Sequence, residues 1–371
     1  MSLLTACAPA PTTPQYPVKP GTWELSMDID NAQIPLRFEI DKTLNVTIIN
    51  HTERIFIDSV SLVNDTIHIT MPRYNSEFIG IVSADSLISG QWYNYDKQDY
   101  SIPFTARFKT DKIHLENDPK GGTELKYFAT FSPNTEDEYP AIGVFRDYGN
   151  GDLTGTFLTE TGDYRFLQGT KNDNQLTLSC FDGAHMFLFR GTMKGDSIVN
   201  GLFNSGKHYE DQWVAALDPF AELTDPDSLT YLVSNPEEIS FEVMDLSGEF
   251  ASFSNDDYLG RVTIIQIFGS WCPNCYDENE FYKLLHDTYA KQGFQVIPVA
   301  FESSDDFARN AEAVKSQFKA IGITYPAYLG GKASKTIASE TFPMLNKVIS
   351  FPTSIYLDKM GKVRKIHTGF Y

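Results

Sequence analysis

The feature that most constrains this chain is a pair of cysteines, Cys272 and Cys275, at the start of a predicted helix. An apolar run over residues 262–268 precedes the pair and has the length and β-branched content of a buried strand. After the pair, apolar residues at spacings of three and four, including Phe281 and Leu284, predict one face of a helix. The order strand, Cys-Pro-Asn-Cys, helix places Cys272 where the helix begins.

A cysteine at the first turn of a helix has distinctive chemistry. Its sulfur points at unpaired backbone N–H groups and at the positive end of the helix dipole, which favours the thiolate, the reactive form. A second cysteine three residues later lies one turn away, close enough to attack a mixed disulfide and release a reduced substrate. We therefore predict that Cys272 and Cys275 form a two-electron dithiol–disulfide switch.

Zinc binding is the alternative for such a pair. Structural zinc is normally bound by four ligands, and a second Cys-x-x-Cys or a histidine pair supplies the remaining two. Neither stands near Cys272 in the sequence, where His286 and His367 are isolated. We expect a redox pair that uses no metal and no cofactor.

Residues around the pair extend the pattern. Phe268 and Trp271 precede Cys272, and a Phe351-Pro352-Thr353 sequence stands near the end of the chain. Over roughly residues 237–371 the sequence resembles the thioredoxin superfamily, and specifically its exported TlpA/ResA-type thiol-disulfide oxidoreductases. The resemblance implies an α/β thioredoxin-like domain over this range.

The resemblance also implies roles for individual positions. Cys272 would be the exposed nucleophile, Cys275 the resolving thiol and Trp271 a flanking aromatic residue. Pro352 would follow a cis peptide bond and lie against the motif, where the preceding backbone can pair with an extended substrate. Glu278 matches a carboxylate that tunes the thiols, although a carboxylate early in a helix is also typical of a solvated surface.

Two departures from the family pattern bear on mechanism and stability. Classical thioredoxins have a buried aspartate six residues before the first cysteine, where this sequence has Gln266, and the proton acceptor is therefore left open. Family members continue beyond the Gly369-Phe370 region with a C-terminal helix, whereas this sequence ends at Tyr371. If nothing else covers that sheet face, we expect an exposed apolar patch and an association site there.

The first half of the chain has a different periodicity. Residues 21–216 contain short alternating runs of β-branched and aromatic residues, separated by turn sequences. Examples lie at residues 37–40, 45–49, 66–70, 78–82, 155–158, 175–179 and 186–190. This pattern predicts an all-β antiparallel barrel or sandwich. We expect Cys180, in one of these runs, to be a small buried hydrophobic residue.

This β-rich half is also duplicated. Eight positions recur in phase 111 residues later. They are Phe78, Gly80, Val82, Asp85, Ser86, Leu87, Gly90 and Trp92, matched by Phe189, Gly191, Met193, Asp196, Ser197, Ile198, Gly201 and Phe203. We place the copies at about 21–115 and 122–216, with five or six strands each. Two similar sheets or two halves of one barrel fit this period, and the aromatic residues predict a packed core, with an enclosed ligand as the alternative.

The N-terminal segment, residues 1–20, has the composition of a tether. Leu4-Thr5-Ala6-Cys7 matches the four-residue pattern at which bacterial lipoprotein signals are cut, which leaves the cysteine as a lipid-modified N-terminus. An export signal also needs a charged and an apolar segment ahead of that pattern. The prolines that follow Cys7 favour an extended chain. We expect a lipoprotein anchored at Cys7 in the bacterial cell envelope, facing the periplasm.

An acidic connector joins the two halves. Thirteen carboxylates and no lysine or arginine lie between Lys207 and Arg261, and we place a solvated linker at residues 217–236. The formal net charge of -19 repels phosphate backbones, so nucleic-acid binding is disfavoured. No apolar run approaches the length of a membrane helix, so we expect membrane attachment only through the lipid.

Together these features predict an exported thiol-disulfide oxidoreductase. It would exchange or reduce disulfides in periplasmic partner proteins, and a separate redox partner would recycle the dithiol. One alternative is a peroxiredoxin-like peroxidase, although those enzymes use a threonine shortly before an isolated cysteine. The other is a ligand- or partner-binding lipoprotein in which the β-rich half is the main functional module.

Overall fold

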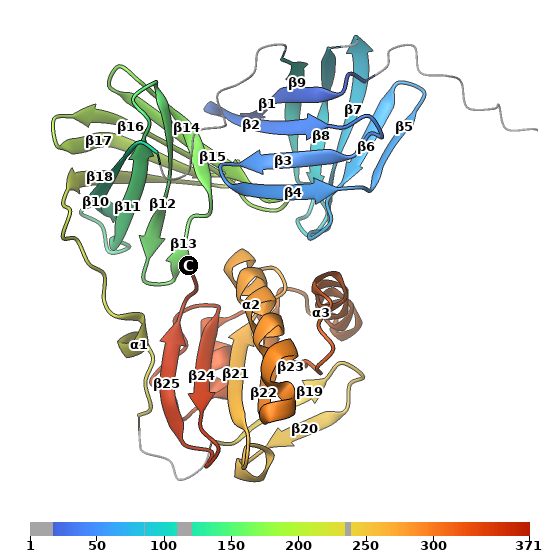
Figure 1. The fold of residues 1–371 in the computed structure, drawn as a ribbon, viewed down its shortest axis with the longest axis vertical. Coiled ribbons are helices and arrows are strands. Elements are labelled where there is room, and N and C mark those ends of the chain that lie inside the picture. The colour runs from blue at the N-terminus through green and yellow to red at the C-terminus, as the bar shows by residue number, and fades with distance from the viewer. Residues whose placement is uncertain (1–17, 85, 110–120, 234–238) are drawn as a thin grey trace, which may run out of the picture. The chain divides into compact units, whose positions relative to one another are not determined.

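The computed structural model describes residues 18–84, 86–109, 121–233 and 239–371, so Cys7 and residues 1–17 of the predicted tether lie outside the described residues (Figure 1). Residue Val18, at the end of the predicted tether, is buried in the core of the first unit. The chain forms two compact units. Of the described residues, the first unit contains those from 18 to 139, Gly143–Thr156 and Arg165–Pro219, and the second contains Pro140–Ile142, Phe157–Tyr164 and those from 220 to 371. Each unit has its own hydrophobic core.

The first copy of the repeat folds as a nine-stranded antiparallel sheet in the order β4-β3-β2-β1-β9-β8-β7-β6-β5. Its strands are β1 (Gly21–Ile29), β2 (Ala32–Ile40), β3 (Val46–Asn50), β4 (Glu53–Ile57), β5 (Val60–Val63), β6 (Thr66–Thr70), β7 (Ser76–Ala84), β8 (Leu87–Asn94) and β9 (Ser101–Phe108). Alternate side chains enter the core, as Trp23, Leu25 and Met27 do on β1.

The second copy repeats this arrangement in a second nine-stranded sheet. Its strands are β10 (Thr123–Phe131), β11 (Tyr139–Asp147), β12 (Asp152–Thr159), β13 (Gly162–Asp163), β14 (Leu167–Asn172), β15 (Gln175–Phe181), β16 (Met186–Lys194), β17 (Ser197–Ser205) and β18 (Tyr209–Leu217). In both sheets the first strand pairs with the second and with the last, and in this sheet a β11–β12 pairing closes a barrel. The all-β antiparallel prediction is confirmed.

The predicted count of five or six strands per copy is wrong, because the described residues of each copy form nine. Short strands such as β5 and β13 carry too few alternating residues to stand out in the sequence. The two copies also form separate sheets and not halves of one barrel.

Matched positions of the repeat occupy the same place in each sheet. Phe78 lies opposite Trp92 in the first sheet, and their counterparts Phe189 and Phe203 lie opposite each other in the second. A Cβ on Gly90 would lie 2.0 Å from the carbonyl oxygen of Ile79, so this strand crossing requires glycine. The repeated positions are therefore those at which the packing of neighbouring strands restricts the side chain.

The two sheets share a core. Phe181, Met186 and Leu188 of the second sheet belong to the buried cluster formed by the first. The Asn50 side chain donates to the Phe181 carbonyl (2.8 Å) and accepts from its N–H (3.1 Å), so a side chain replaces a ladder hydrogen bond between the copies.

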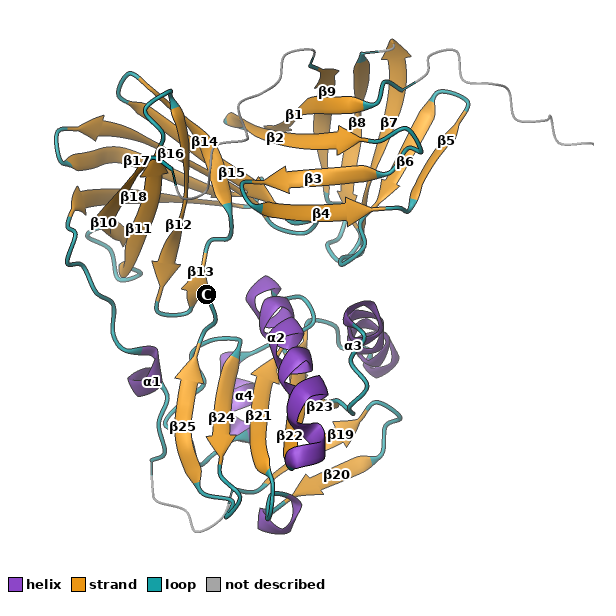
Figure 2. Cartoon of the chain, in the orientation of Figure 1, coloured by secondary structure: helices purple, strands orange, loops and turns teal. Residues whose placement is uncertain are grey.

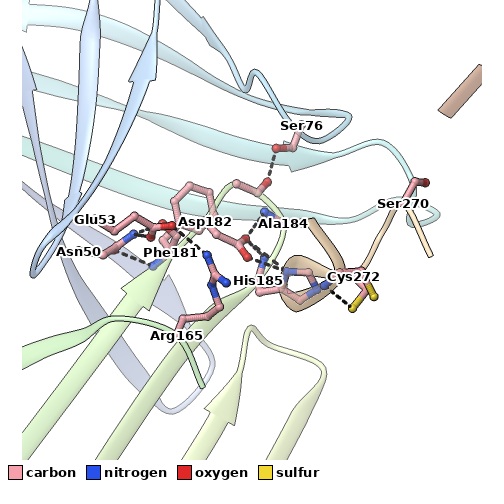
Figure 3. Close-up of polar contacts among 12 residues, drawn as sticks. Asn50, Glu53, Ser76, Arg165, Phe181, Asp182, Ala184, His185, Ser270 and Cys272 are labelled. Atoms are coloured by element: carbon pink, nitrogen blue, oxygen red, sulfur yellow. Dashed lines mark hydrogen bonds and ion pairs between the residues drawn. The ribbon is translucent and has the colours of Figure 1, made fainter. Parts of the chain in front are cut away.

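An ion-pair network lies beside this junction (Figure 3). Arg165 donates to Glu53 at 2.9 Å, and both side chains are buried. Burial raises the pKa of Glu53, and pairing with Arg165 opposes that rise. Asp182 pairs with His185 at 3.0 Å; although burial acts to raise the pKa of Asp182, the charges and hydrogen bonds of its partners lower it to about 2.

We expect Arg165→Met to lower the free energy of unfolding by about 3 kcal/mol, because it leaves a buried carboxylate unpaired. Arg146→Met is the matched control, since its partner Glu124 is exposed and such pairs contribute about 1 kcal/mol or less. Chemical denaturation measures both. Equal, small losses would show that the buried pair does not stabilise the junction.

The second unit contains a seven-stranded sheet in the order β20-β19-β23-β22-β21-β24-β25. Its strands are β19 (Phe241–Asp245), β20 (Phe250–Phe253), β21 (Val262–Phe268), β22 (Phe294–Glu302), β23 (Tyr328–Lys332), β24 (Thr353–Leu357) and β25 (Val363–Thr368). Its helices are α1 (Pro226–Leu229), α2 (Pro273–Tyr289), α3 (Phe307–Ile321) and α4 (Lys335–Thr341). Strands β21, β22 and β23 are parallel, and β24 and β25 are antiparallel additions.

Helices cover both faces of this sheet. Figure 2 shows α2 and α4 on opposite faces. Helix α3 packs with α2 in one buried cluster, whereas Ala338 of α4 belongs to the cluster on the other face. The α/β thioredoxin-like prediction is confirmed.

The apolar row of α2 is largely exposed. Phe281, Leu284 and Tyr289 are 45%, 62% and 46% exposed. The side of α2 that packs against the sheet carries Cys275, Glu278 and Tyr282 instead. Among the described residues, no helix is both long and apolar enough to cross a membrane.

Candidate active site

Cys272 caps the N-terminus of α2. Strand β21 ends at Phe268, and α2 begins at Pro273, whose missing N–H is tolerated at a first helical position. The Sγ of Cys272 accepts a hydrogen bond from the backbone N–H of Cys275 at 3.3 Å. The sulfur therefore occupies the position in which an N-terminal side chain satisfies a free helix N–H.

The expectation that Cys272 is exposed is wrong, because the residue is only 5% exposed. Its Sγ also donates to the Phe351 carbonyl oxygen at 3.4 Å, so the thiol lies between the helix and the loop that contains Pro352. Cys275 is fully buried, and both cysteines are free thiols.

The loop around Pro352 lies directly against the motif. The Phe351–Pro352 peptide bond is cis, the geometry that the resemblance implied. The ring of Trp271 meets that of Phe351 edge-on, with centroids 5.7 Å apart, and its Nε1 donates to the Phe301 carbonyl at 2.9 Å. The structure thus brings Trp271, Cys272 and Pro352 together.

A short segment of the second unit, Phe157–Tyr164, borders the same loop. Ser350 Oγ donates to the Thr161 carbonyl at 2.8 Å. A Cβ on Gly162 would lie 2.3 Å from Asn274 Nδ2, within the motif itself. Nothing in the sequence pattern of this segment signals such a position.

Glu278 is a buried residue, and its interpretation as a solvated helix residue is wrong. It is 1% exposed, one helical turn beyond Cys275. Its carboxylate accepts hydrogen bonds from Gln266 Nε2 (2.8 Å), Tyr282 Oη (2.9 Å) and Ser354 Oγ (3.1 Å). Burial outweighs these bonds and raises the pKa of Glu278 to about 7.

Gln266 can form a hydrogen bond with Glu278 whether Glu278 is ionised or protonated. Its Nε2 donates to the carboxylate, while its Oε1 is buried without a hydrogen-bond partner. Rotating the amide would present Oε1 to a protonated Glu278, which could then donate to it. The two side chains can therefore match each other in both charge states.

A hydrogen-bond chain continues from Glu278. Tyr282 Oη lies 2.8 Å from Tyr356 Oη, whose side chain is only half-buried. These contacts connect the buried carboxyl group to a residue at the edge of the core.

Cys275 is held in its protonated form. Burial raises the pKa of its thiol well above the usual value, and the hydrogen bond and charge of Cys272 and the charge of Glu278 add to this. The site thus combines a capping thiol, a buried protonated thiol and a carboxyl group that titrates near neutrality.

The part of the chain that carries this site is similar to known proteins. Residues 236–370 match the Redoxin family model. Residues 236–370 form a Redoxin domain. The thiol-disulfide oxidoreductase ResA of Geobacillus thermodenitrificans is 29% identical over 129 residues, which cover 35% of this chain and 66% of that protein. The chain thus spans just under two thirds of that relative's length.

Two further matches involve Bacillus subtilis. Its sporulation thiol-disulfide oxidoreductase A is 26% identical over 129 residues, 35% of this chain and 70% of that protein. The crystal structure of StoA is 24% identical and covers 36% of this chain and 89% of that chain, with a TM-score of 0.27.

A second buried carboxylate supports the loop before the motif of the Redoxin domain. Glu302 accepts hydrogen bonds from both the N–H and the Oγ of Ser270 at 2.7 Å. No sequence motif marks Glu302 as a site residue. It is the last residue of β22, beside the end of the parallel strand β21, and carboxyl ends of parallel strands commonly build sites.

The other candidate histidines contact residues other than the two motif cysteines. In the part of the chain that the structure describes, no three His, Cys, Asp or Glu side chains are arranged to hold a metal ion. Cys180 is buried in the first unit. His367 binds Asp227 at 2.6 Å, and His286 packs on Tyr325.

We expect Glu278→Gln to change how stability depends on pH. A carboxyl group whose pKa rises from 4.5 to about 7 on folding binds more protons in the folded state, so stability falls as pH rises through this interval. The variant should lose this fall and be more stable at pH 8 by about 2 to 3 kcal/mol. Denaturation at a series of pH values measures it.

Glu280→Gln, an exposed change on the same helix, is the control and should keep the slope of the native chain. A Glu278→Gln profile parallel to that of the native chain would contradict the raised pKa.

Proposed function

We propose that the chain is a thiol-disulfide oxidoreductase that acts on disulfide-containing partner proteins through Cys272 and Cys275. The observation that carries this proposal is the hydrogen bond from the Cys275 N–H to Cys272 Sγ at the start of α2. That N–H can stabilise negative charge on Cys272 Sγ. Burial keeps the thiol of Cys275 protonated. The two thiols are therefore prepared for different steps.

In the first step, the Cys272 thiolate attacks one sulfur of a substrate disulfide. A Cys272–substrate bond forms, the substrate S–S bond breaks, and the released substrate thiolate takes up a proton. In the second step, Cys275 gives up its proton and attacks Cys272 Sγ, which releases the second substrate thiol. The enzyme dithiol loses two electrons and the substrate disulfide gains them. A separate redox partner would reverse this change.

Glu278 is the group we propose to take the proton from Cys275. It lies one turn away on the same face of α2, and a carboxyl group with a pKa of about 7 can accept or return a proton near neutral pH. Tyr282 and Tyr356 would connect it to the edge of the domain. Glu278 would thus take the proton-acceptor role that Gln266 cannot fill, because an amide side chain does not titrate.

Trp271 and Pro352 would form the surface on which substrate docks. Trp271 is 36% exposed beside Phe351, and its indole is fixed by a hydrogen bond to the backbone. In the reduced chain the Phe351 carbonyl already receives the Cys272 thiol. Loss of that thiol proton would free the carbonyl for an extended substrate.

We expect Cys275→Ser to accumulate a mixed disulfide between Cys272 and a substrate, because the resolving sulfur is absent. Cys272→Ser should form no adduct and lose exchange activity by more than a hundredfold. Cys180→Ser is the control and should leave exchange unchanged, since Cys180 is buried in the first unit. Non-reducing gels and peptide mapping identify the adduct. An adduct at Cys180 would refute the assignment.

We expect Tyr282→Phe to shift the pH dependence of exchange. The Tyr282 hydroxyl lowers the pKa of Glu278, so its loss should move the midpoint of the pH–rate profile upward by about one pH unit. Tyr289→Phe, an exposed change on the same helix, should leave the midpoint in place. A midpoint that both variants leave unchanged would argue against Glu278 as the proton acceptor.

We further propose that the protein is exported and anchored by lipid at Cys7, with the Redoxin domain facing the periplasm. The Leu4-Thr5-Ala6-Cys7 pattern and the proline-rich segment after it support this proposal. Mass spectrometry of the N-terminal peptide from bacterial membranes should find acylated Cys7, and Cys7→Ala should move the protein to the soluble fraction. An unmodified Cys7 in the membrane-associated protein would refute it.

A further inference from the structure

The first unit contains a cleft of about 670 Å³ between its two sheets. Strands β1, β2 and β9 form one wall, and β14, β15 and β16 form the other. On β1 the lining residues Glu24, Ser26 and Asp28 point away from the core, and the core residues Leu25 and Leu36 also border the cleft.

Three arginines reach this cleft from the two sheets. On the first sheet, Glu24 of β1 lies opposite Arg37 of β2 and opposite Arg107 of β9, so the two arginines flank it on the same face. On the second sheet, Arg190 of β16 lies opposite Thr177 of β15. All five residues line the cleft.

These guanidinium groups have N–H donors that can still form ion pairs or hydrogen bonds. Within the described ranges, Arg37, Arg107 and Arg190 form no ion pair; Glu24 pairs instead with Lys109 at 2.8 Å. Glu24 and Asp152 interact with Arg37 electrostatically, at distances longer than that of an ion pair. Arg190 donates to Asn204 through one nitrogen, and its Nε is buried without a hydrogen-bond partner.

The walls are held by hydrogen bonds between the sheets and present further polar groups. Gln168 Nε2 donates to the Ile49 carbonyl (2.5 Å), its Oε1 accepts from the His51 N–H (2.8 Å), and Ser179 Oγ donates to the Pro35 carbonyl. The hydroxyl-bearing residues Ser26, Thr105, Thr170 and Thr177 also line the cleft, together with Leu25 and Leu36, and Ser26 Oγ is buried without a partner.

We propose that this cleft binds a small organic ligand that carries carboxylate and hydroxyl groups, such as an acidic sugar or a hydroxy acid. Guanidinium groups pair with carboxylates through two parallel hydrogen bonds, and the threonine and serine hydroxyls both donate and accept. The cleft has the volume of a small-molecule site. Three arginines against Glu24 and Asp28 give it an excess of positive charge in a chain of net charge -19. The site is independent of the dithiol.

Calorimetric titration of the full chain with D-glucuronate, with citrate and with glucose as the neutral control tests the proposal. We expect saturable binding of at least one of the two anions, weakened by added salt, and no binding of glucose. Arg37→Gln and Arg190→Gln should each weaken binding at least tenfold. Lys194→Gln, which removes one positive charge from an exposed position outside the cleft, should not.

Thermal unfolding of each variant separates loss of the site from loss of the fold. Unchanged melting temperatures with weakened binding support the proposal. Binding that persists in a folded Arg37→Gln/Arg190→Gln double variant would overturn it, and so would a native chain that binds neither anion. Thiol-disulfide exchange should be unaltered in all these variants.

Discussion

The chemistry that we propose for this protein depends on one hydrogen bond, from the backbone N–H of Cys275 to the sulfur of Cys272. It exists because β21 ends at Phe268 and α2 begins at Pro273, which leaves Cys272 to cap the helix. Helix N–H groups without intrahelical partners favour negative charge on the group that caps them. The same turn buries Cys275, so one short segment gives two chemically different thiols.

A buried carboxyl group on the helix replaces one on the strand. Gln266 occupies the strand position where thioredoxins have aspartate, and it donates to Glu278 on α2. Tyr282 and Ser354 complete the surroundings of Glu278. The proton acceptor that we propose therefore lies on the helix that carries both cysteines, and Gln266 is its hydrogen-bond partner.

The sequence predicted those elements whose pattern is local. Residues 262–268 were recognisable as a strand from their apolar run, and the repeat revealed two similar β-rich copies. Burial of Cys272 and Glu278 was not predictable, because it depends on residues such as Phe351 and Ser354 that lie far away in the chain. Glu302 was missed for the same reason. Short strands were not predicted, because two or four residues are too few to show an alternation of apolar and polar side chains.

A redox titration of the native chain in glutathione buffers, followed by thiol blocking and peptide mapping, tests the central claim most directly. Our account predicts a single two-electron transition in which Cys272 and Cys275 oxidise together to one disulfide while Cys180 stays reduced. A transition that leaves either motif cysteine as a thiol, or that involves Cys180, would contradict it.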